Sequence, residues 1–294
     1  MRTFGWFLIL FFVGFTAMAA LSYPAWLLLS PHFDIKFHRV ASRIGMLTLL
    51  FSFLWASKRL ALRDWRNLGY TLTTGQFLSE ALLGLVLGFA TILPVVVIML
   101  GLNLRVMRAG VILDMHTLLV LISSGLLTGL TVALIEETFF RGAMFSGIKR
   151  EAGALIAIFL SSVLYSSTHF IGRFHIEATA VNAYSGIDLL VGTLAFFTHP
   201  LQLVDAFLCL SGVGALLALV RLLTGNIAAC VGLHAAWVCI ITVLRKTSSP
   251  NFNHPWQGLL SQFDGVVGWL VFVWTAVMAA ALWWFYSRRI NGAK

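Results

Sequence analysis

Long apolar segments recur along the chain, each bounded by charged residues or by proline and glycine. A helix that crosses the hydrocarbon core of a bilayer needs about 20 consecutive, mostly apolar residues. The pattern therefore predicts an all-α fold, a polytopic membrane helical bundle of about eight transmembrane helices. The expected spans are Phe4–Leu21, Ile44–Ser57, Ser79–Gly101, Thr117–Ile135, Ala152–His169, Leu203–Leu223, Asn226–Leu244 and Gly265–Tyr286.

Three connections between the expected spans are longer than the others. Lys58–Gln76 mixes leucine and tryptophan with arginine, an amphipathic pattern that favours the plane of the membrane interface. Ile171–Gln202 is expected to be the longest loop and contains His199, and Arg245–Asp264 is expected to be irregular. The first apolar run resembles a signal peptide near residues 17–19, but its length favours a retained helix.

The composition strengthens the membrane prediction. Hydrophobic residues make up 60% of the chain and charged residues 11%, and the mean hydropathy is +0.92. A soluble domain has roughly half apolar and a quarter charged residues. The net charge of +9 comes from basic residues that flank apolar segments and form no stripe with interleaved aromatics. We therefore expect membrane lipids, and no nucleic acid, as partners of these residues.

The charge distribution also predicts an orientation. With eight spans, both termini lie on the same side of the membrane. That side carries the larger share of the Lys and Arg residues. The positive-inside rule then places both termini in the cytoplasm.

Ionisable side chains next to or within apolar spans are costly, so each of them requires an explanation. Glu136 and Glu137 follow the fourth expected span directly, and Arg141 lies four residues after Glu137. At this spacing Glu137 and Arg141 share one helix face and can form an ion pair. Glu136, about 100° around the helix, is then free to face a cavity.

Two histidines lie on other expected helices. His169 ends the fifth span and His234 lies within the seventh. A lone histidine in an apolar helix is usually a hydrogen-bonded core residue, but two of them and a glutamate pair on three helices indicate one interior site. A carboxylate beside a histidine can activate water for peptide hydrolysis, and a second histidine can stabilise the oxyanion.

The same residues allow a metal-dependent alternative. Glu136, His169 and His234 form the two-histidine, one-carboxylate set of a catalytic zinc site. A His-Glu-x-x-His helix is absent from the sequence. The residues by themselves leave a cofactor-free glutamate mechanism and a zinc mechanism open.

Other classes of function fit the sequence less well. A rhomboid-type serine protease needs a Gly-x-Ser-Gly turn, and Cys209 occupies its first glycine position. Cys230 and His234 share a helix face, but an apolar setting does not activate a thiol. A transporter or immunity protein that binds protons or a ligand at the Glu/His cluster remains the alternative outside the enzymes. The break at Pro94 has no counterpart later in the chain, which disfavours transport.

The order Glu136-Glu137-x-x-x-Arg141, an aromatic-x-x-x-His169 segment and then His234 resembles the CAAX-protease and bacteriocin-processing (CPBP, or Abi) family of intramembrane endopeptidases. By that resemblance residues 117–244 form the catalytic core. Residues 1–116 then carry N-terminal helices with the interfacial segment, and residues 245–294 a loop and a last helix. The departures are Tyr165, where the family usually has Phe, and Val238, where it often has Asn.

The resemblance also implies roles and a substrate class. Glu136 and His169 would activate the water, His234 would help to stabilise the oxyanion, and Glu137 with Arg141 would shape the site. The substrate would be a membrane-associated or lipidated polypeptide that is cut near one terminus. The family alternative is a bacteriocin-immunity protein without catalysis. We expect an integral protein of a bacterial plasma (inner) membrane.

Overall fold

The computed structural model describes residues 1–60, 62, 64–170, 174–195 and 203–292, with the side chains of 195 and 289–292 left out. His199 of the expected long loop lies outside these residues. Seven of the described helices are long and apolar enough to cross a membrane. The predicted all-α membrane bundle is therefore confirmed.

The helices that correspond to the expected spans follow one another in the predicted order. They are α1 (Arg2–Leu29), α2 (Phe37–Ser57), α3 (Thr74–Gly101), α4 (Met115–Glu137), α6 (Ala154–Thr168), α8 (Val204–Thr224), α9 (Ala228–Thr247) and α10 (Trp269–Gly292). Helix α5 (Phe145–Ala152) lies between α4 and α6 and corresponds to none of the expected spans. Helix α6 has 15 residues and is shorter than a full span, although it lies where the fifth span was expected.

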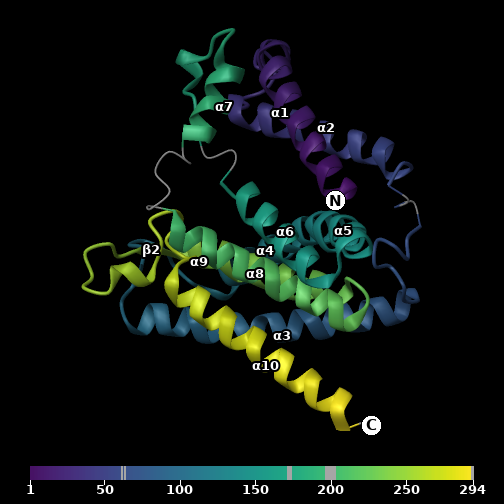
Figure 1. Ribbon diagram of the computed structural model, residues 1–294. Helices are drawn as coiled ribbons and strands as arrows, with labels where there is room; N and C mark the ends of the chain where they lie inside the picture. The colour runs from purple at the N-terminus through teal and green to yellow at the C-terminus, as the bar shows by residue number, and fades with distance from the viewer. Residues whose placement is uncertain (61, 63, 171–173, 196–202, 293–294) are drawn as a thin grey trace.

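Helix α9 lies at the centre of the bundle and packs against α3 on one side and α4 on the other (Figure 1). Glycines make these contacts close. A Cβ added at Gly88 of α3 would lie 2.9 Å from the Leu233 carbonyl oxygen, and one at Gly125 of α4 would lie 3.1 Å from the Cys239 carbonyl oxygen. Small residues drive helix association in membranes because they allow backbones to approach. The result is a tight layer of three helices.

The remaining helices surround this layer. Helix α6 packs on α8, and α10 packs on the other side of α8. Helices α1 and α2 pair with each other and lie with α7 (Ser185–Ala195) in a separate group at the top of Figure 1. Phe7 of α1 and Phe53 of α2 join the largest buried cluster, which attaches this group to the rest.

The fourth expected span was placed with its end at Ile135, but the helix continues much further. After α4 the backbone forms a π-helix, η1 (Thr138–Met144), and then α5 up to Ala152. The apolar helical stretch Met115–Ala152 is 38 residues long. It ends where Gly153 adopts a φ of 87°, a left-handed conformation that favours glycine. The glutamate pair therefore lies inside a long helix and not at its end.

The expected loop Ile171–Gln202 contains an additional helix. Helix α7 packs on α1, after a single 3₁₀ turn, η2 (Ala178–Ala180). The sequence analysis expected a loop here, and that prediction is wrong for Ser185–Ala195. An 11-residue helix is too short to span the membrane, which is why the search for long apolar runs missed it.

The described part of the segment between α2 and α3 contains turns, and three of its leucines are buried. Leu60, Leu62 and Leu68 are buried in the same cluster as Phe140, whereas Trp65 is 66% exposed. The Leu60 carbonyl accepts a hydrogen bond from Arg150 at 2.9 Å. The segment thus covers η1 and α5, and only part of it has the amphipathic role that was expected.

A short sheet, which the sequence analysis did not predict, joins the connections that follow α3 and α9. Strand β1 (Arg105–Met107) pairs antiparallel with β2 (Ser248–Pro250), with Val106 opposite Ser249. Arg105 is buried beneath it and donates to the Ser248 hydroxyl and carbonyl at 2.9 Å each. Burial lowers the pKa of Arg105, and nearby Asp264 opposes that shift. A 3₁₀ turn, η5 (Gln257–Leu259), follows in the expected irregular loop.

Candidate active site

Glu136 and Glu137 form the last turn of α4, immediately before the π-helix η1. A π-helix is rare and often occurs at functional sites, because its wider turn changes the direction of the side chains next to it. The predicted ion pair is present: Arg141 Nη1 lies 3.1 Å from Glu137 Oε1. Both side chains are almost fully buried, at 1% and 0% exposure. Arg141 also donates to the Gly214 carbonyl of α8 at 3.3 Å.

His234 of α9 joins the glutamate pair. Its Nδ1 lies 2.7 Å from Glu137 Oε1, and its Nε2 lies 3.9 Å from Glu136 Oε2. Glu137 Oε1 therefore accepts hydrogen bonds from both Arg141 and His234. The side chain of Glu136 remains 29% exposed and has no direct hydrogen bond to His234. The two carboxylates thus have different environments, one fixed and one partly open.

His169 lies directly after α6, where the backbone of that helix ends. Its Nδ1 makes a hydrogen bond of 2.9 Å with the Tyr165 carbonyl oxygen, so Nδ1 is the protonated nitrogen of the neutral ring. Nε2 is then the nitrogen that can accept a proton. The His169 ring packs edge-on against Tyr165 with 4.5 Å between ring centroids.

Tyr165 lies closer to the centre of the site than the sequence analysis expected. Its ring lies 6.2 Å from the ring of His234, and the Arg141 guanidinium lies 4.3 Å from its centroid. It therefore contacts His169 on one side and Arg141 on another. The signal was present in the sequence, because Tyr165 precedes His169 by one helical turn.

Two carboxylate oxygens at the site lack partners among the described residues. Glu136 Oε2 and Glu137 Oε2 are buried and accept no hydrogen bond from them. Buried carboxylate oxygens without a donor are unfavourable, since each loses its hydration.

The metal-dependent alternative requires Glu136, His169 and His234 to converge on one point. In the part of the chain that the structure describes, no group of three or more His, Cys, Asp or Glu side chains could hold a metal ion. Glu136, His169 and His234 are therefore not grouped as three metal ligands within these described residues. Cys230 does not contribute either, because its thiol donates to the Leu217 carbonyl at 3.3 Å.

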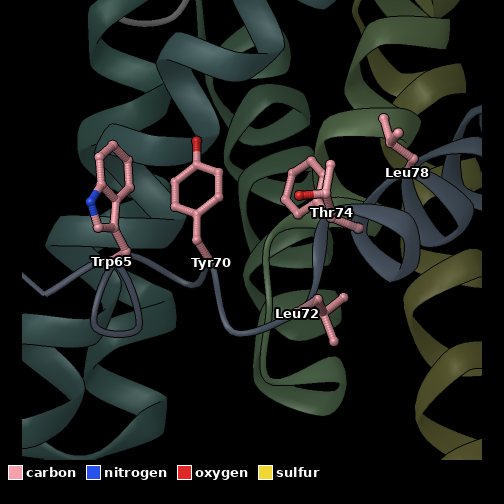
Figure 2. A pocket seen from close by; sticks show the side chains of 6 residues that line it. Trp65, Tyr70, Leu72, Thr74 and Leu78 are labelled. Atoms are coloured by element: carbon pink, nitrogen blue, oxygen red, sulfur yellow. The ribbon is translucent and has the colours of Figure 1, made fainter.

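A pocket lies close to the site, where the segment after α2 meets the start of α3 (Figure 2). It has a volume of about 310 Å³ and is lined by Trp65, Tyr70, Leu72, Thr74, Phe77 and Leu78. Figure 2 shows the Tyr70 ring rising from the loop with its hydroxyl pointing away from it. That hydroxyl lies 2.7 Å from the Thr138 hydroxyl, one residue beyond Glu137.

Comparison with known families agrees with this geometry. The helices define an integral membrane protein. Residues 118–240 match the family model described as type II CAAX prenyl endopeptidase, Rce1-like, and this match supports a CAAX-type intramembrane protease domain in that part of the chain. The match runs from α4 to α9 and includes Glu136, Glu137, Arg141, His169 and His234. Comparison with curated proteins and with solved structures gave no match.

Proposed function

We propose that this protein is an intramembrane endopeptidase that cuts a membrane-associated or lipidated polypeptide near one terminus, with a water molecule activated by Glu136 and His169. The observation that carries the proposal is the buried network of Glu137, Arg141 and His234 beside the partly open Glu136. A buried ionic network is often no more stabilising than apolar packing, so its presence beside a partly open carboxylate supports a functional site.

Glu136 is the proposed general base and acid. Its carboxylate takes a proton from water while the water oxygen adds to the scissile carbonyl carbon. It then gives the proton to the amine nitrogen as the C–N bond breaks. Partial exposure supports this role, since a base must reach water and substrate. His169 Nε2 is the second acceptor that can orient the water, because Nδ1 is committed to the Tyr165 carbonyl.

His234 is the proposed donor to the oxyanion, and Glu137 positions it. When the imidazole carries both protons, Nδ1 donates to Glu137 and the N–H of Nε2 points to the side of Glu136. A donor aimed at the developing oxyanion is worth about 3–4 kcal/mol in other hydrolases.

The substrate proposal follows from the family and the location of the site. The matched family is described as prenyl endopeptidases, whose substrates carry a lipid. A site formed by helices that cross the bilayer is reached more easily by a polypeptide that is held in the membrane. We therefore expect a lipid-linked or membrane-anchored substrate.

We further propose that α6 crosses the membrane as an eighth segment beside the seven long apolar helices, and that both termini face the cytoplasm of a bacterial cell. The N-terminal amino group lies 2.9 Å from Glu151 Oε2, so it shares one end of the bundle with Lys149 and Arg150. Reporter fusions after Arg150 and at Lys294 should both give cytoplasmic signals. An extracytoplasmic signal from either fusion would contradict this orientation.

The test of the enzymatic function does not presuppose a substrate. Peptide termini are compared proteome-wide in cells that express the wild type, Glu136→Ala or His169→Ala at equal levels. One or a few membrane polypeptides should keep the same extra segment in both variants. The double variant should be no worse than either single one, since the two groups act as a unit.

The control is Glu177→Ala, which removes an exposed carboxylate outside the site. It should leave all termini as in the wild type. If the termini are identical in every strain under conditions that require the protein, the peptidase function is wrong. A non-catalytic role in transport or immunity would then replace it.

A further inference from the structure

We propose that Tyr70 is a positioning residue for the Glu136–Glu137 pair and acts through the hydroxyl of Thr138. The inference rests on the proposed function for its catalytic consequence. Tyr70 belongs to the segment before α3 and lies outside the residues 118–240 that match the family. Its hydroxyl oxygen and that of Thr138 are 2.7 Å apart, although the two residues are 68 positions apart in the chain.

The direction of this hydrogen bond follows from the other contact of Thr138. The Thr138 hydroxyl donates to the Leu134 carbonyl oxygen, one turn earlier in α4, at 2.6 Å. A hydroxyl has one hydrogen, so Thr138 can only accept from Tyr70. The Tyr70 O–H is therefore the donor, and phenylalanine cannot replace it.

Tyr70 is itself held on two sides. Its ring stacks on Phe77 of α3 with 5.5 Å between centroids at 21°, and packs edge-on against Trp65 at 5.4 Å. Its backbone N–H donates to the Trp65 carbonyl at 2.9 Å. The preceding residue, Gly69, accepts from the Ile227 N–H at the start of α9 at 3.2 Å. Through these contacts Tyr70 links Thr138 to α3 and to α9. Helix α9 is the helix that carries His234.

A restraint on Thr138 acts directly on the backbone next to the glutamate pair. It is the first residue of the π-helix η1 and directly follows Glu137. A π-helix has poorer hydrogen bonding than an α-helix and depends on contacts from outside. One such contact is at Gly142, where an added Cβ would collide with the Leu68 carbonyl. Tyr70 provides the corresponding restraint at the other end of η1.

The catalytic consequence concerns the separation of Glu136 Oε2 and His234 Nε2, which is 3.9 Å. This gap has to hold a reacting water or carbonyl oxygen. A misplacement of about 1 Å in such a site can cost roughly 100-fold in rate. Loss of the Tyr70 bond frees the start of η1 and with it the carboxylate of Glu136. We therefore expect the maximal rate to fall and substrate binding to change little.

The experiment uses the full-length protein in detergent and an internally quenched peptide that ends in a farnesylated Cys-aliphatic-aliphatic-X sequence. Tyr70→Phe keeps both ring contacts and removes only the hydroxyl. It should lower kcat by about 10- to 100-fold with KM within about twofold. Tm should fall by no more than about 4 °C, the effect of one hydrogen bond. Tyr184→Phe is the control, because Tyr184 is 71% exposed in a loop.

Variants of Thr138 separate positioning from a general structural effect. Thr138→Val should reproduce the kcat loss of Tyr70→Phe, and the double variant should be no worse than either single one. Thr138→Ser keeps the hydroxyl acceptor and should retain most of the wild-type kcat. A merely structural role predicts a fall in Tm and expression without this pattern. Additive losses, or a Tyr70→Phe variant with the kcat of the wild type, would overturn the inference.

A second measurement needs no substrate and separates failure of the inference from failure of the proposed function. Amide hydrogen exchange of Tyr70→Phe should be faster within residues 138–144 and unchanged in α9. If the wild-type protein cleaves neither this peptide nor any cellular polypeptide, the proposed function is wrong. The hydrogen-exchange result alone then tests the positioning role of Tyr70. Unchanged exchange in η1, or a uniform increase over the whole chain, would overturn the positioning role.

Discussion

Removal of the Arg141 guanidinium should destabilise the bundle far more than removal of the Glu136 charge. Arg141 and Glu137 are 1% and 0% exposed, so Arg141→Ala leaves a buried carboxylate without its closest cation. Breaking a buried ion pair in this way costs about 3–5 kcal/mol. His234 remains 2.7 Å from Glu137 and can still donate to it. We therefore expect the lower end of the range, about 3 kcal/mol.

The assay is thermal unfolding of the purified protein in detergent, followed by the fluorescence of its ten tryptophans. A loss of about 3 kcal/mol lowers Tm by roughly 6–12 °C in a chain of this size. Glu137→Gln should also lower Tm, because it leaves Arg141 unpaired. Glu136→Gln should stay within about 2 °C of the wild type, since its side chain is 29% exposed and accepts no hydrogen bond from His234.

The matched control is Lys149→Ala, which removes a positive charge from an exposed position of α5. Exposed substitutions of this kind change stability by about 0.5 kcal/mol or less. If Arg141→Ala unfolds at the same temperature as the control, the buried ion pair does not stabilise the fold. If Glu136→Gln loses more stability than Glu137→Gln, the roles of the two glutamates are reversed.

Two further substitutions test the surroundings of the site. Val238→Asn should preserve or increase cleavage, because it adds a donor one turn after the proposed oxyanion residue; a large loss of cleavage would contradict this. Gly129→Leu should lower Tm and remove activity, because its Cβ would collide with the carbonyl of Ala235 in α9. Gly5→Leu is its control, since no atom lies within 4 Å of a Cβ at Gly5, and a similar effect of both would exclude packing as the cause.

Local spacing predicted part of the site correctly. The Glu137–Arg141 pair follows from a four-residue separation on one helix, and the structure places these atoms 3.1 Å apart. The bond from His234 to Glu137 joins residues 97 apart in sequence. That His234 would lie beside the glutamate pair could be inferred from the cost of ionisable side chains in a membrane. Which carboxylate His234 would contact could not, because that depends on the packing of α9.

The elements that the sequence failed to predict are short or depend on distant contacts. Long apolar runs identify spans well, so the bundle was predictable. Helix α7 and the three-residue strands β1 and β2 have too few residues for a periodic pattern. The π-helix η1 has no local composition signal, since Thr138–Met144 is mostly apolar like its neighbours. It is contacted by Leu68 and Tyr70, which are far away in the chain.

The glycine contacts of α9 restrict how a protein with this architecture can change over time. Gly88 and Gly125 place the backbones of α3 and α4 directly against α9, so few side chains between these helices can be exchanged for larger or smaller ones. A larger side chain at Gly88 or Gly125 would displace the backbone of α9, and with it His234. New substrate preferences would therefore have to arise at the periphery, where the walls of the pocket are side chains such as Trp65 and Leu78. The architecture separates a closely packed core that is hard to vary from a pocket wall of side chains that can be exchanged.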